Sequence, residues 1–393
     1  MKILIALTYY RPHISGLTIY VERLAAALAA RGHCVTILTS RYDAALPAQE
    51  LIDGVRVVRA PVWMRISKGV IMPGFGDIAR ALLREHDIVN IHVPQFDAAG
   101  LAVSAKFITR TPVILTYHCD LRLPPGRFSR IAGGIISAAN LVATTLADRI
   151  VTSTEDYAAH SPLLRRFRSK WAPIPPPVVL PPLLPGVVNA FAERWDLVHH
   201  RPVIGFIARF AAEKGVEVII EAMPRILQEY PQARVLFTGP YRNVLGEQAY
   251  AQRLAPMIER LGPHWMFTDV LSQQDLMALY ATSDVVVLPS LNSTESFGLV
   301  QVEAMLHGAP VVASDRPGVR APIQLTGMGE LAPTGDPASF AEAVLRVLRD
   351  RATYVRPRAE VATHFDIEQT VTLYERLFEH EIASIMQRRL KSP

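Results

Sequence analysis

The chain has 393 residues, of which 50% are hydrophobic and 20% charged, a balance typical of a folded globular protein and not of a disordered one. That length exceeds what one ordinary hydrophobic core supports, and two domains of about 180 residues each are expected. The two cysteines, Cys34 and Cys119, have neither the number nor the spacing for a disulfide framework or a zinc site, and they indicate a reducing, cytoplasmic setting.

The net charge of +5 is unevenly distributed along the chain. Residues 1–185 hold 21 Lys and Arg against 12 Asp and Glu, whereas residues 186–393 hold 20 against 24. A basic first half indicates an anionic partner, and ordinary scatter of solvated charges explains it equally well. Residues 2–8 are too short for a signal-peptide core, and residues 131–147 are too short and too polar for a spanning helix, which predicts that nothing crosses a membrane.

The first half alternates short apolar runs with helical segments. Residues 3–8 are typical of a buried parallel strand, and residues 17–30 of the helix that follows it. Further strands are predicted at residues 35–39, 55–58, 88–93, 113–117 and 149–153. Such alternation predicts a doubly wound parallel sheet, although the first turn lacks the Gly-x-Gly-x-x-Gly pattern of a dinucleotide site.

A proline-rich stretch, residues 173–185, separates this half from the next and is expected to be a stiff, extended connector. The alternation then restarts. Strands are predicted at residues 203–208, 234–238, 265–267, 284–288 and 310–313. One helix is predicted to end near Tyr230, and others to cover residues 273–280, 337–350 and 366–391. The sequence therefore predicts an α/β protein with two Rossmann-like, doubly wound parallel-sheet domains, residues 1–185 and 186–365.

The loop after the strand at residues 284–288 carries the most distinctive pattern. A helix is predicted to start near Ser296, which leaves the backbone N–H groups of Phe297, Gly298 and Leu299 free to bind an anion. Glu295 and Glu303 bracket this helix start, about 10 Å apart along the helix. A ligand with an anionic middle and polar ends, such as a sugar nucleotide, fits this pattern; an ordinary N-cap cluster with a solvated glutamate is the alternative.

Other polar residues follow strands, where ligands of such sheets bind. Arg209 and Lys214 supply two cations suited to a diphosphate, His118 ends an apolar strand with Asp120 nearby, and Gly16 precedes the first helix. Each also has a structural interpretation, as a solvated cation, a core-edge histidine or a turn glycine. The loops concerned cover residues 9–16, 118–122, 209–214, 239–242 and 290–298, and they line one cleft if the domains face each other.

Several motifs are absent from the sequence. There is no Asp-x-Asp pair, no Gly-x-x-x-x-Gly-Lys-Ser/Thr loop, no Gly-x-Ser-x-Gly elbow and no His-Glu-x-x-His. Without a candidate metal site, the charge of a leaving diphosphate has to be met by Arg209, Lys214 and helix N–H groups.

Three segments together resemble the retaining GT-B glycosyltransferases of family 4, and the resemblance covers nearly the whole chain. They are Gly205-Phe-Ile-Ala-Arg-Phe-x-x-Glu-Lys-Gly215, Leu279-Tyr-x-x-x-Asp-Val-Val-Val-Leu-Pro-Ser290 and Glu295-Ser-Phe-Gly-Leu-Val-Gln-Val-Glu-Ala304, extended by Pro310-Val-Val-Ala-Ser-Asp-x-Pro-Gly318. The resemblance implies transfer of a hexosyl group from a nucleotide sugar, with retention at the anomeric carbon and no essential metal or cofactor. A UDP-sugar is the favoured donor and GDP-mannose the next.

The resemblance also implies roles for individual residues. Arg209 and Lys214 would hold the diphosphate, Glu303 the ribose hydroxyls, and Glu295 the donor sugar. The N–H groups of Phe297, Gly298 and Leu299 would contact sugar and phosphate, with Gly16 and Gly239 in the neighbouring loops. His118 would lie near the reacting sugar, and the last helix, residues 366–393, would pack on the first domain.

Two departures from the family pattern concern the acceptor side and the hinge. Ser15-Gly16 stands where the family has two adjacent glycines, and Ile174-Pro-Pro-Pro-Val178 replaces the usual Ile-Pro-Asn-Gly-Val. A glycan, glycolipid or lipid-linked acceptor is expected on the first domain. A glycosyl phosphorylase, a sugar-nucleotide epimerase and a non-catalytic nucleotide-sugar-binding protein remain alternatives.

Peripheral contact with the inner face of an anionic membrane is a further hypothesis, and solvated faces are its alternative. It rests on a group of basic residues in the first half: Lys106, Arg110, Arg122, Arg127, Arg130, Arg165, Arg166, Arg168 and Lys170.

Overall fold

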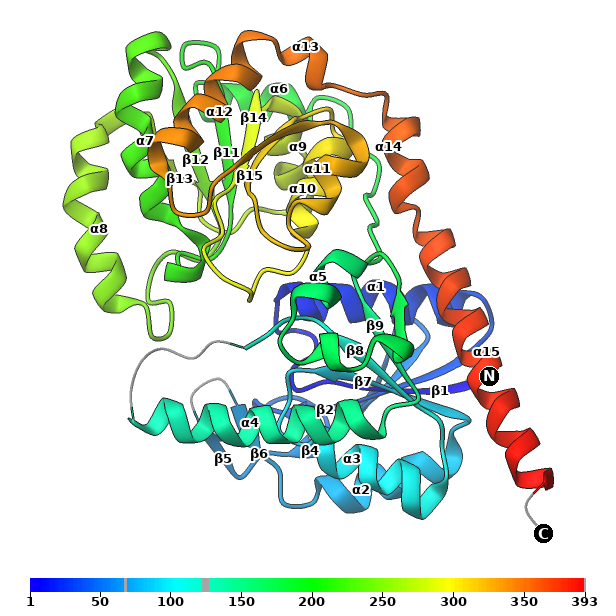
Figure 1. Ribbon diagram of the computed structural model, residues 1–393. Helices are drawn as coiled ribbons and strands as arrows, with labels where there is room; N and C mark the ends of the chain where they lie inside the picture. Colours follow the sequence, from blue (N-terminus) through cyan, green and yellow to red (C-terminus); the bar gives the residue numbers. More distant parts are fainter. Residues whose placement is uncertain (67–68, 122–126, 392–393) are drawn as a thin grey trace. The chain divides into compact units, whose positions relative to one another are not determined.

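The computed structural model describes residues 1–66, 69–121 and 127–391, and its internal contacts divide the chain into two units. Unit 1 contains Met1–Val179 and Asp366–Pro393, and unit 2 contains Leu180–Phe365. Each unit is built on its own, largely parallel sheet with helices on both faces, as Figure 1 shows. The α/β fold class with two doubly wound sheets, predicted from the sequence, is confirmed.

The sheet of unit 1 has the strand order β10-β9-β8-β7-β1-β2-β4-β3. All its pairs are parallel except β3 with β4, which makes β3 an antiparallel edge strand. The strands are β1 (Lys2–Ala6), β2 (Cys34–Arg41), β3 (Gln49–Ile52), β4 (Val55–Pro61), β7 (Ile88–Val93), β8 (Val113–Tyr117), β9 (Arg149–Thr152) and β10 (Trp171–Pro173), and a separate antiparallel pair joins β5 (Met64–Ile66) to β6 (Gly69–Ile71).

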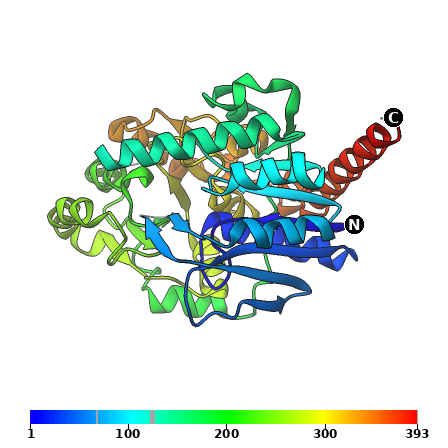
Figure 2. The same ribbon diagram turned by 90° about the horizontal axis from the view of Figure 1, so that it is seen from below.

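Alternate residues of these strands face two helical layers. Leu4 and Ala6 pack with α2, α3 and α4 on one face, and Ile3 and Ile5 pack with α1 and α15 on the other. The helices are α1 (Gly16–Ala30), α2 (Phe75–Glu85), α3 (Ala98–Val103), α4 (Arg127–Leu146), α5 (Glu155–His160) and α15 (Ile367–Lys391), with a π-helical turn η1 (Ser104–Thr109) and 3₁₀ turns η2 (Leu164–Arg166) and η3 (Arg168–Lys170). Figure 2 shows the cyan α3 and the teal α4 side by side over the sheet.

The sheet of unit 2 has the order β13-β12-β11-β14-β15-β16, and every pair in it is parallel. Gly205 of β11 pairs with Leu236 of β12 and with Val286 of β14, which fixes the register at the centre of the sheet. The strands are β11 (Val203–Ile207), β12 (Arg234–Thr238), β13 (Trp265–Phe267), β14 (Val285–Leu288), β15 (Val311–Ser314) and β16 (Gly329–Ala332).

Helices cover both faces of this second sheet. Ile204 and Phe206 pack with α7, α8 and α12, whereas Val203 and Leu236 pack with α6 and α9. The helices are α6 (Val187–Arg194), α7 (Val216–Glu229), α8 (Gln248–Leu261), α9 (Gln273–Thr282), α10 (Leu299–Leu306), α11 (Ala321–Thr326), α12 (Pro337–Arg349), α13 (Arg351–Tyr354) and α14 (Arg358–Phe365), with 3₁₀ turns η4 (Ala212–Lys214) and η5 (Gly262–His264).

Each strand order contains a point at which the chain reverses its direction across the sheet. In unit 1 this point lies between β1 and β7, and in unit 2 between β11 and β14. Loops that leave neighbouring strands in opposite directions there open a crevice at the carboxyl edge of the sheet, which is where such folds bind ligands. The loops after β1, β7 and β8 and those after β11, β12 and β14 are therefore the candidates for a site.

Candidate active site

Two loops of unit 2 are joined at the carboxyl ends of β11 and β14. The backbone N–H of Leu291 donates to the carbonyl oxygen of Glu213 at 2.9 Å. A Cβ atom at Gly215 would lie only 2.1 Å from the carbonyl oxygen of Pro289, which means that only glycine permits this approach. The motif around Lys214 and the loop before α10 thus form one continuous surface.

An ion pair crosses the same junction. Lys214 Nζ lies 2.6 Å from Glu295 Oε2, and both side chains are about four-fifths buried, at 19% and 18% exposure. Arg209 pairs with Glu213 at 2.7 Å and remains more open, with 44% of its side chain exposed. The two cations predicted to hold a diphosphate and the carboxylate predicted to face the sugar therefore belong to one charged cluster.

The start of α10 differs from the sequence prediction. The helix begins at Leu299 and not near Ser296, because Gly298 adopts a left-handed conformation with φ of 81°. Glu295 and Phe297 consequently lie in the loop, and Gly298 occupies the N-cap position. The amide of Gln301 fastens this turn, since its Nε2 donates to the carbonyl oxygens of Phe297 at 2.8 Å and Val319 at 2.9 Å.

Glu303 is the fifth residue of α10 and is held in place by a residue that sequence analysis did not single out. The hydroxyl of Tyr280, on α9, donates to Glu303 Oε2 at 2.9 Å, and Glu303 as a residue is only 7% exposed. The ring of Tyr280 stacks on His307, whose pKa burial lowers. Gly239 follows β12, where its N–H donates to the carbonyl oxygen of Asp269 at 3.0 Å.

In unit 1, His118 follows β8 and is paired with a second histidine. His118 Nε2 lies 2.8 Å from Nδ1 of His92, a fully buried residue of β7, and the two rings stack with centroids 5.1 Å apart. Burial lowers the pKa of His118 to about 4 and that of His92 well below its usual value. Both imidazoles are therefore neutral at physiological pH.

Hydroxyl groups continue this neutral network into the core. The ring of Tyr20, on α1, stands edge-on to His118 with centroids 4.9 Å apart. Its hydroxyl oxygen lies 2.7 Å from that of Tyr374 on α15, which in turn lies 3.2 Å from Thr116 Oγ1. The last helix of the chain thus supplies a buried hydroxyl group to this network.

Asp120, two residues after His118, accepts hydrogen bonds from three neighbouring hydroxyl groups. Its Oδ1 accepts from the hydroxyls of Tyr117 and Ser161, both at 2.8 Å, and its Oδ2 accepts from the hydroxyl of Tyr157 at 3.1 Å. The carboxylate therefore fastens the loop after β8 to α5. Nearby Arg122 lies outside the described residues.

Gly16 is the first residue of α1, and Ser15 caps that helix by accepting a hydrogen bond from the N–H of Thr18 at 3.2 Å. The loop before it rests on Arg59, a residue only 2% exposed whose guanidinium donates to the carbonyl oxygen of Arg11 at 2.9 Å. The serine that replaces the first family glycine thus has a structural role of its own.

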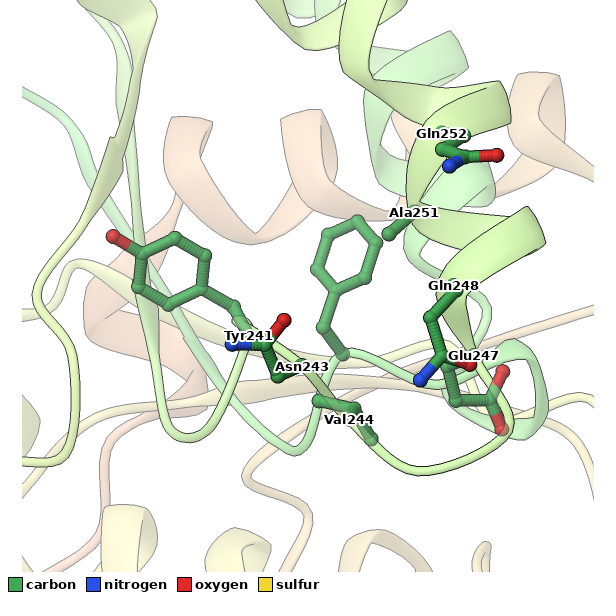
Figure 3. Close-up of a pocket in the computed structure, with 8 residues that line it drawn as sticks. Tyr241, Asn243, Val244, Glu247, Gln248, Ala251 and Gln252 are labelled. Carbon is green, nitrogen blue, oxygen red and sulfur yellow. The ribbon is translucent and has the colours of Figure 1, made fainter.

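A small pocket lies elsewhere in unit 2, beside the start of α8. It has a volume of about 200 Å³, and Figure 3 shows Tyr241 and Asn243 among its walls together with Glu247, Gln248 and Ala251. Ligand pockets usually measure about 300–1,000 Å³. None of the predicted site residues lines this pocket, and it carries no functional assignment.

Two further observations concern metals and membranes. Within the described residues, no three His, Cys, Asp or Glu side chains gather in a way that suits a metal ion. None of the helices in that part of the chain combines the length and apolar character that crossing a membrane requires.

Two positions that sequence reasoning missed carry a recognisable signal. His92 and Asn90 are the polar residues of the strand Ile88–Val93, and a polar group in a fully buried strand requires a partner. Tyr280 lies directly after Leu279 in a segment that is buried throughout, so its hydroxyl also requires a partner.

Comparison with known families and proteins agrees with this geometry. The family described as "Glycosyl transferases group 1" matches residues 189–363, and the "Glycosyl transferase 4-like domain" matches residues 15–177. A D-inositol 3-phosphate glycosyltransferase of Geodermatophilus obscurus is 28% identical, over 91% of this chain and 82% of its own. The phosphatidyl-myo-inositol mannosyltransferase of Mycobacterium leprae is 26% identical, over 93% and 92%.

Solved structures share the fold at lower identity. HepE of Anabaena in complex with UDP superimposes with a TM-score of 0.75 at 19% identity, covering 97% of this chain and 100% of that one. Sucrose-phosphate synthase of Thermosynechococcus elongatus gives a TM-score of 0.76 at 20% identity, covering 98% and 99%. The chain belongs to the GT4-type glycosyltransferases of GT-B fold, enzymes that transfer glycosyl groups.

Proposed function

We propose that this enzyme transfers a hexosyl group from a nucleotide sugar to an acceptor with retention at the anomeric carbon. Unit 2 is the donor-binding domain and unit 1 the acceptor-binding domain. The observation that carries the proposal is the Lys214–Glu295 pair, which sets a cation and a carboxylate 2.6 Å apart beside the start of α10. A donor needs both charges, one for its diphosphate and one for its sugar hydroxyls.

The donor contacts follow from the surface around that pair. Arg209 and Lys214 bind the diphosphate, and the N–H groups of Phe297, Gly298 and Leu299 supply further donors to phosphate and sugar. A side chain at Gly298 would crowd Leu288 and Gln301, so packing as well as the left-handed backbone requires glycine at this helix start. Glu303, oriented by Tyr280, accepts from the ribose hydroxyls.

The chemical step requires no protein nucleophile. The bond from the anomeric carbon to the diphosphate oxygen breaks, the acceptor oxygen bonds to the same face of that carbon, and the acceptor proton passes to the departing diphosphate. Arg209, Lys214 and the start of α10 stabilise the negative charge that develops on the diphosphate. Glu295 orients the sugar hydroxyls, and His118 of unit 1 is the group that we assign to the transferred sugar.

A UDP-sugar is the donor that we propose. Three structural neighbours are HepE of Anabaena with UDP, with UDP and glucose, and with UDP-glucose, and a trehalose-6-phosphate structure from E. coli contains UDP-2-fluoro glucose. GDP-mannose is the second candidate, because the mycobacterial relatives are named mannosyltransferases. No metal ion takes part in the proposed reaction, since the cations named above balance the diphosphate charge.

The acceptor that we propose carries an anionic or lipid-linked polyol. The relatives named above act on inositol phosphate or phosphatidylinositol, according to their names. Residues 1–185 carry a net charge of +9, from 21 Lys and Arg against 12 Asp and Glu, which suits an anionic acceptor on unit 1. The helix start at Gly16 supplies N–H groups on the acceptor side.

We also propose peripheral contact between unit 1 and an anionic membrane. Exposed apolar side chains lie on η1, with Phe107 68% and Ile108 52% exposed, and on α4, with Ile135 57% exposed. Arg165, Arg166 and Arg168 are exposed cations of the turns η2 and η3, next to Lys170, which binds the end of α4. Exposed apolar side chains and exposed cations on the same unit suit contact with an anionic lipid surface.

The basic group predicted from the sequence contributes only in part to such a surface. Lys106 is paired with Asp148 at 2.6 Å, and Lys170 donates to the carbonyl oxygens of Thr145 and Ala147 at the end of α4. Arg110 has partners as well. Arg122 and the side chains of Arg127 and Arg130 lie outside the described residues.

Vesicle flotation tests the membrane contact. The enzyme should float with vesicles that contain phosphatidylglycerol and not with purely zwitterionic ones. Phe107→Ser with Ile108→Ser should abolish flotation, whereas Val198→Ser, at an equally exposed position of unit 2, should not. Flotation that is independent of anionic lipid would exclude the proposal.

A thermal-shift screen tests the donor. A UDP-sugar that binds the folded state at a hundred times its Kd should stabilise the protein by about 2.7 kcal/mol. NMR of the product's anomeric centre, with EDTA present, then tests retention and metal independence. An inverted product, or transfer that requires an added divalent cation, would contradict the proposal.

A further inference from the structure

We propose that His92 is the positioning residue of His118: it donates from Nδ1 to His118 Nε2 and thereby leaves His118 with its hydrogen on Nδ1, as a hydrogen-bond donor to the ligand. The inference rests on the proposed function only for the identity of that ligand, an oxygen of the transferred sugar or of the acceptor. It concerns a residue of β7 to which the family resemblance gives no role.

The contacts around His118 fix its ring. Nε2 is held by His92 Nδ1 at 2.8 Å, one ring face lies against His92 with an interplanar angle of 27°, and Tyr20 stands perpendicular to the ring at 89°. His118 itself is partly exposed, and its Nδ1 has no hydrogen-bond partner among the described residues. Nδ1 is therefore the ring nitrogen that a ligand can reach.

The direction of the hydrogen bond follows from His92. Two neutral imidazoles share one hydrogen between Nδ1 of His92 and Nε2 of His118. If His118 were the donor, the hydrogen of His92 would have to lie on its Nε2, which is buried without a hydrogen-bond partner among the described residues. Buried N–H groups without an acceptor are rare, because their desolvation is not compensated. The favoured arrangement places the hydrogen of His92 on Nδ1.

This arrangement distinguishes two roles for His118. A ring with a bare Nδ1 would accept the acceptor proton as a base, whereas Nδ1–H donates to an oxygen that carries partial negative charge. Burial lowers the pKa of His118 to about 4, which keeps this donor neutral. A neutral donor polarises a sugar hydroxyl or the departing oxygen, and the acceptor proton remains free to pass to the diphosphate.

The tautomer is measurable without any activity. We suggest long-range ¹H–¹⁵N spectra of the full chain with ¹⁵N-labelled histidine, at pH 7.5, with His118 and His92 assigned through their single variants. The expected result is a protonated Nδ1 and an unprotonated Nε2 in both residues. A protonated Nε2 in His118 would overturn the proposal, whatever the enzyme's substrates turn out to be.

A matched pair of variants tests the positioning role. Asn and Leu have nearly the same shape, and only Asn retains a polar N–H group close to the position of Nδ1. His92→Asn should preserve the His118 tautomer and lower kcat by less than about threefold, whereas His92→Leu should give a tautomer mixture and lower kcat by about tenfold.

The two variants also separate positioning from folding and from donor binding. The thermal shift produced by UDP alone should be the same for both variants, because the contacts proposed for the nucleotide lie in unit 2. Equal kcat and equal His118 spectra in the two variants would overturn the proposal. If His92→Leu does not fold, the wild-type spectrum alone decides. The two proposals can fail separately. If His118 carries its hydrogen on Nδ1 but the protein has no transferase activity, the proposed function is refuted and this inference stands.

Discussion

The two candidate sites gather polar groups in opposite ways. In unit 2 the groups are charged and paired, Lys214 with Glu295 across two loops and Arg209 with Glu213 within one loop. In unit 1 they are neutral: His92 stacks on His118, and the hydroxyl groups of Tyr20 and Tyr374 are hydrogen-bonded. The groups of unit 2 follow β11 and β14, where its strand order reverses, whereas His118 of unit 1 follows β8, one strand beyond the reversal between β1 and β7.

The difference reflects what each site is proposed to bind. A nucleotide diphosphate brings two negative charges, and only cations and helix N–H groups compensate them. A sugar or polyol hydroxyl brings no charge, and for it a neutral donor of fixed geometry suffices. The same fold thus supports electrostatic binding in one unit and hydrogen-bond positioning in the other.

The largest effect is expected from removing the charges of unit 2. Lys214→Ala and Glu295→Ala should each lower kcat by about a hundredfold or more, because each removes a group that stabilises the departing diphosphate or orients the sugar. Steady-state kinetics with the identified donor measures the loss. Arg253→Ala, which breaks the exposed pair with Glu217 in the same unit, is the control and should remain active. Near-wild-type turnover of Lys214→Ala would contradict the assignment of this residue to the donor site.

Two glycine positions should respond differently to the same substitution. Gly298→Ala places a Cβ 2.5 Å from Leu288 Cδ2 on a backbone with φ of 81°, and should cost about 1–2 kcal/mol of stability. Gly16→Ala meets nothing within 4 Å and should leave stability unchanged or slightly raised. Urea unfolding compares them. A loss of activity in a fully stable Gly16→Ala would locate a ligand close to that backbone, whereas equal stability losses would refute this distinction.

The neutral network of unit 1 predicts a dependence of stability on pH. Unfolded His118 takes up a proton near pH 6.5, whereas in the folded protein its pKa is about 4. Between these values the unfolded state binds more protons, and stability therefore falls as the pH is lowered. From pH 7 to pH 5 this histidine contributes a loss of about 2 kcal/mol, and His118→Gln should remove that part of the loss. If the unfolding free energies of the wild type and of His118→Gln depend on pH in the same way, the low pKa of folded His118 is contradicted.

The smallest effect concerns the orientation of Glu303. Tyr280→Phe removes the hydroxyl that donates to this carboxylate, and should cost about 1 kcal/mol and raise the donor KM several-fold at unchanged kcat. Tyr354→Phe is the matched control, because Tyr354 donates to Glu330 at 2.6 Å away from the predicted site. It should leave KM unchanged. An unchanged donor KM for Tyr280→Phe would mean that Glu303 binds the donor without the hydrogen bond from Tyr280.

Much of the fold was predictable because apolar strands and proline-rich or glycine-rich loops alternate clearly. Short edge strands escaped prediction: β3 reads Gln-Glu-Leu-Ile and β16 reads Gly-Glu-Leu-Ala, and neither contains an apolar run. The helix start was placed three residues too early, since the left-handed conformation of Gly298 is not visible in a sequence.

The candidate site also contains residues that could be predicted from the sequence and contacts that could not. Arg209, Lys214 and Glu295 could be found because their motifs lie directly after strands. The partner of His92 could not be found, because His118 lies 26 residues away and only the parallel pairing of β7 with β8 brings the two together. Non-local hydrogen bonds depend on strand register, and local patterns do not encode it.

The position of α15 has a consequence for how the chain is made. Val371, Tyr374 and Phe378 complete the core between α1 and the sheet of unit 1, although more than 330 residues separate them from α1. On the ribosome, the whole of Leu180–Phe365 is synthesised in between, which takes roughly 10–40 s. During that time the first unit presents an open apolar face, and the nascent chain therefore offers chaperones a binding surface that the finished enzyme no longer has.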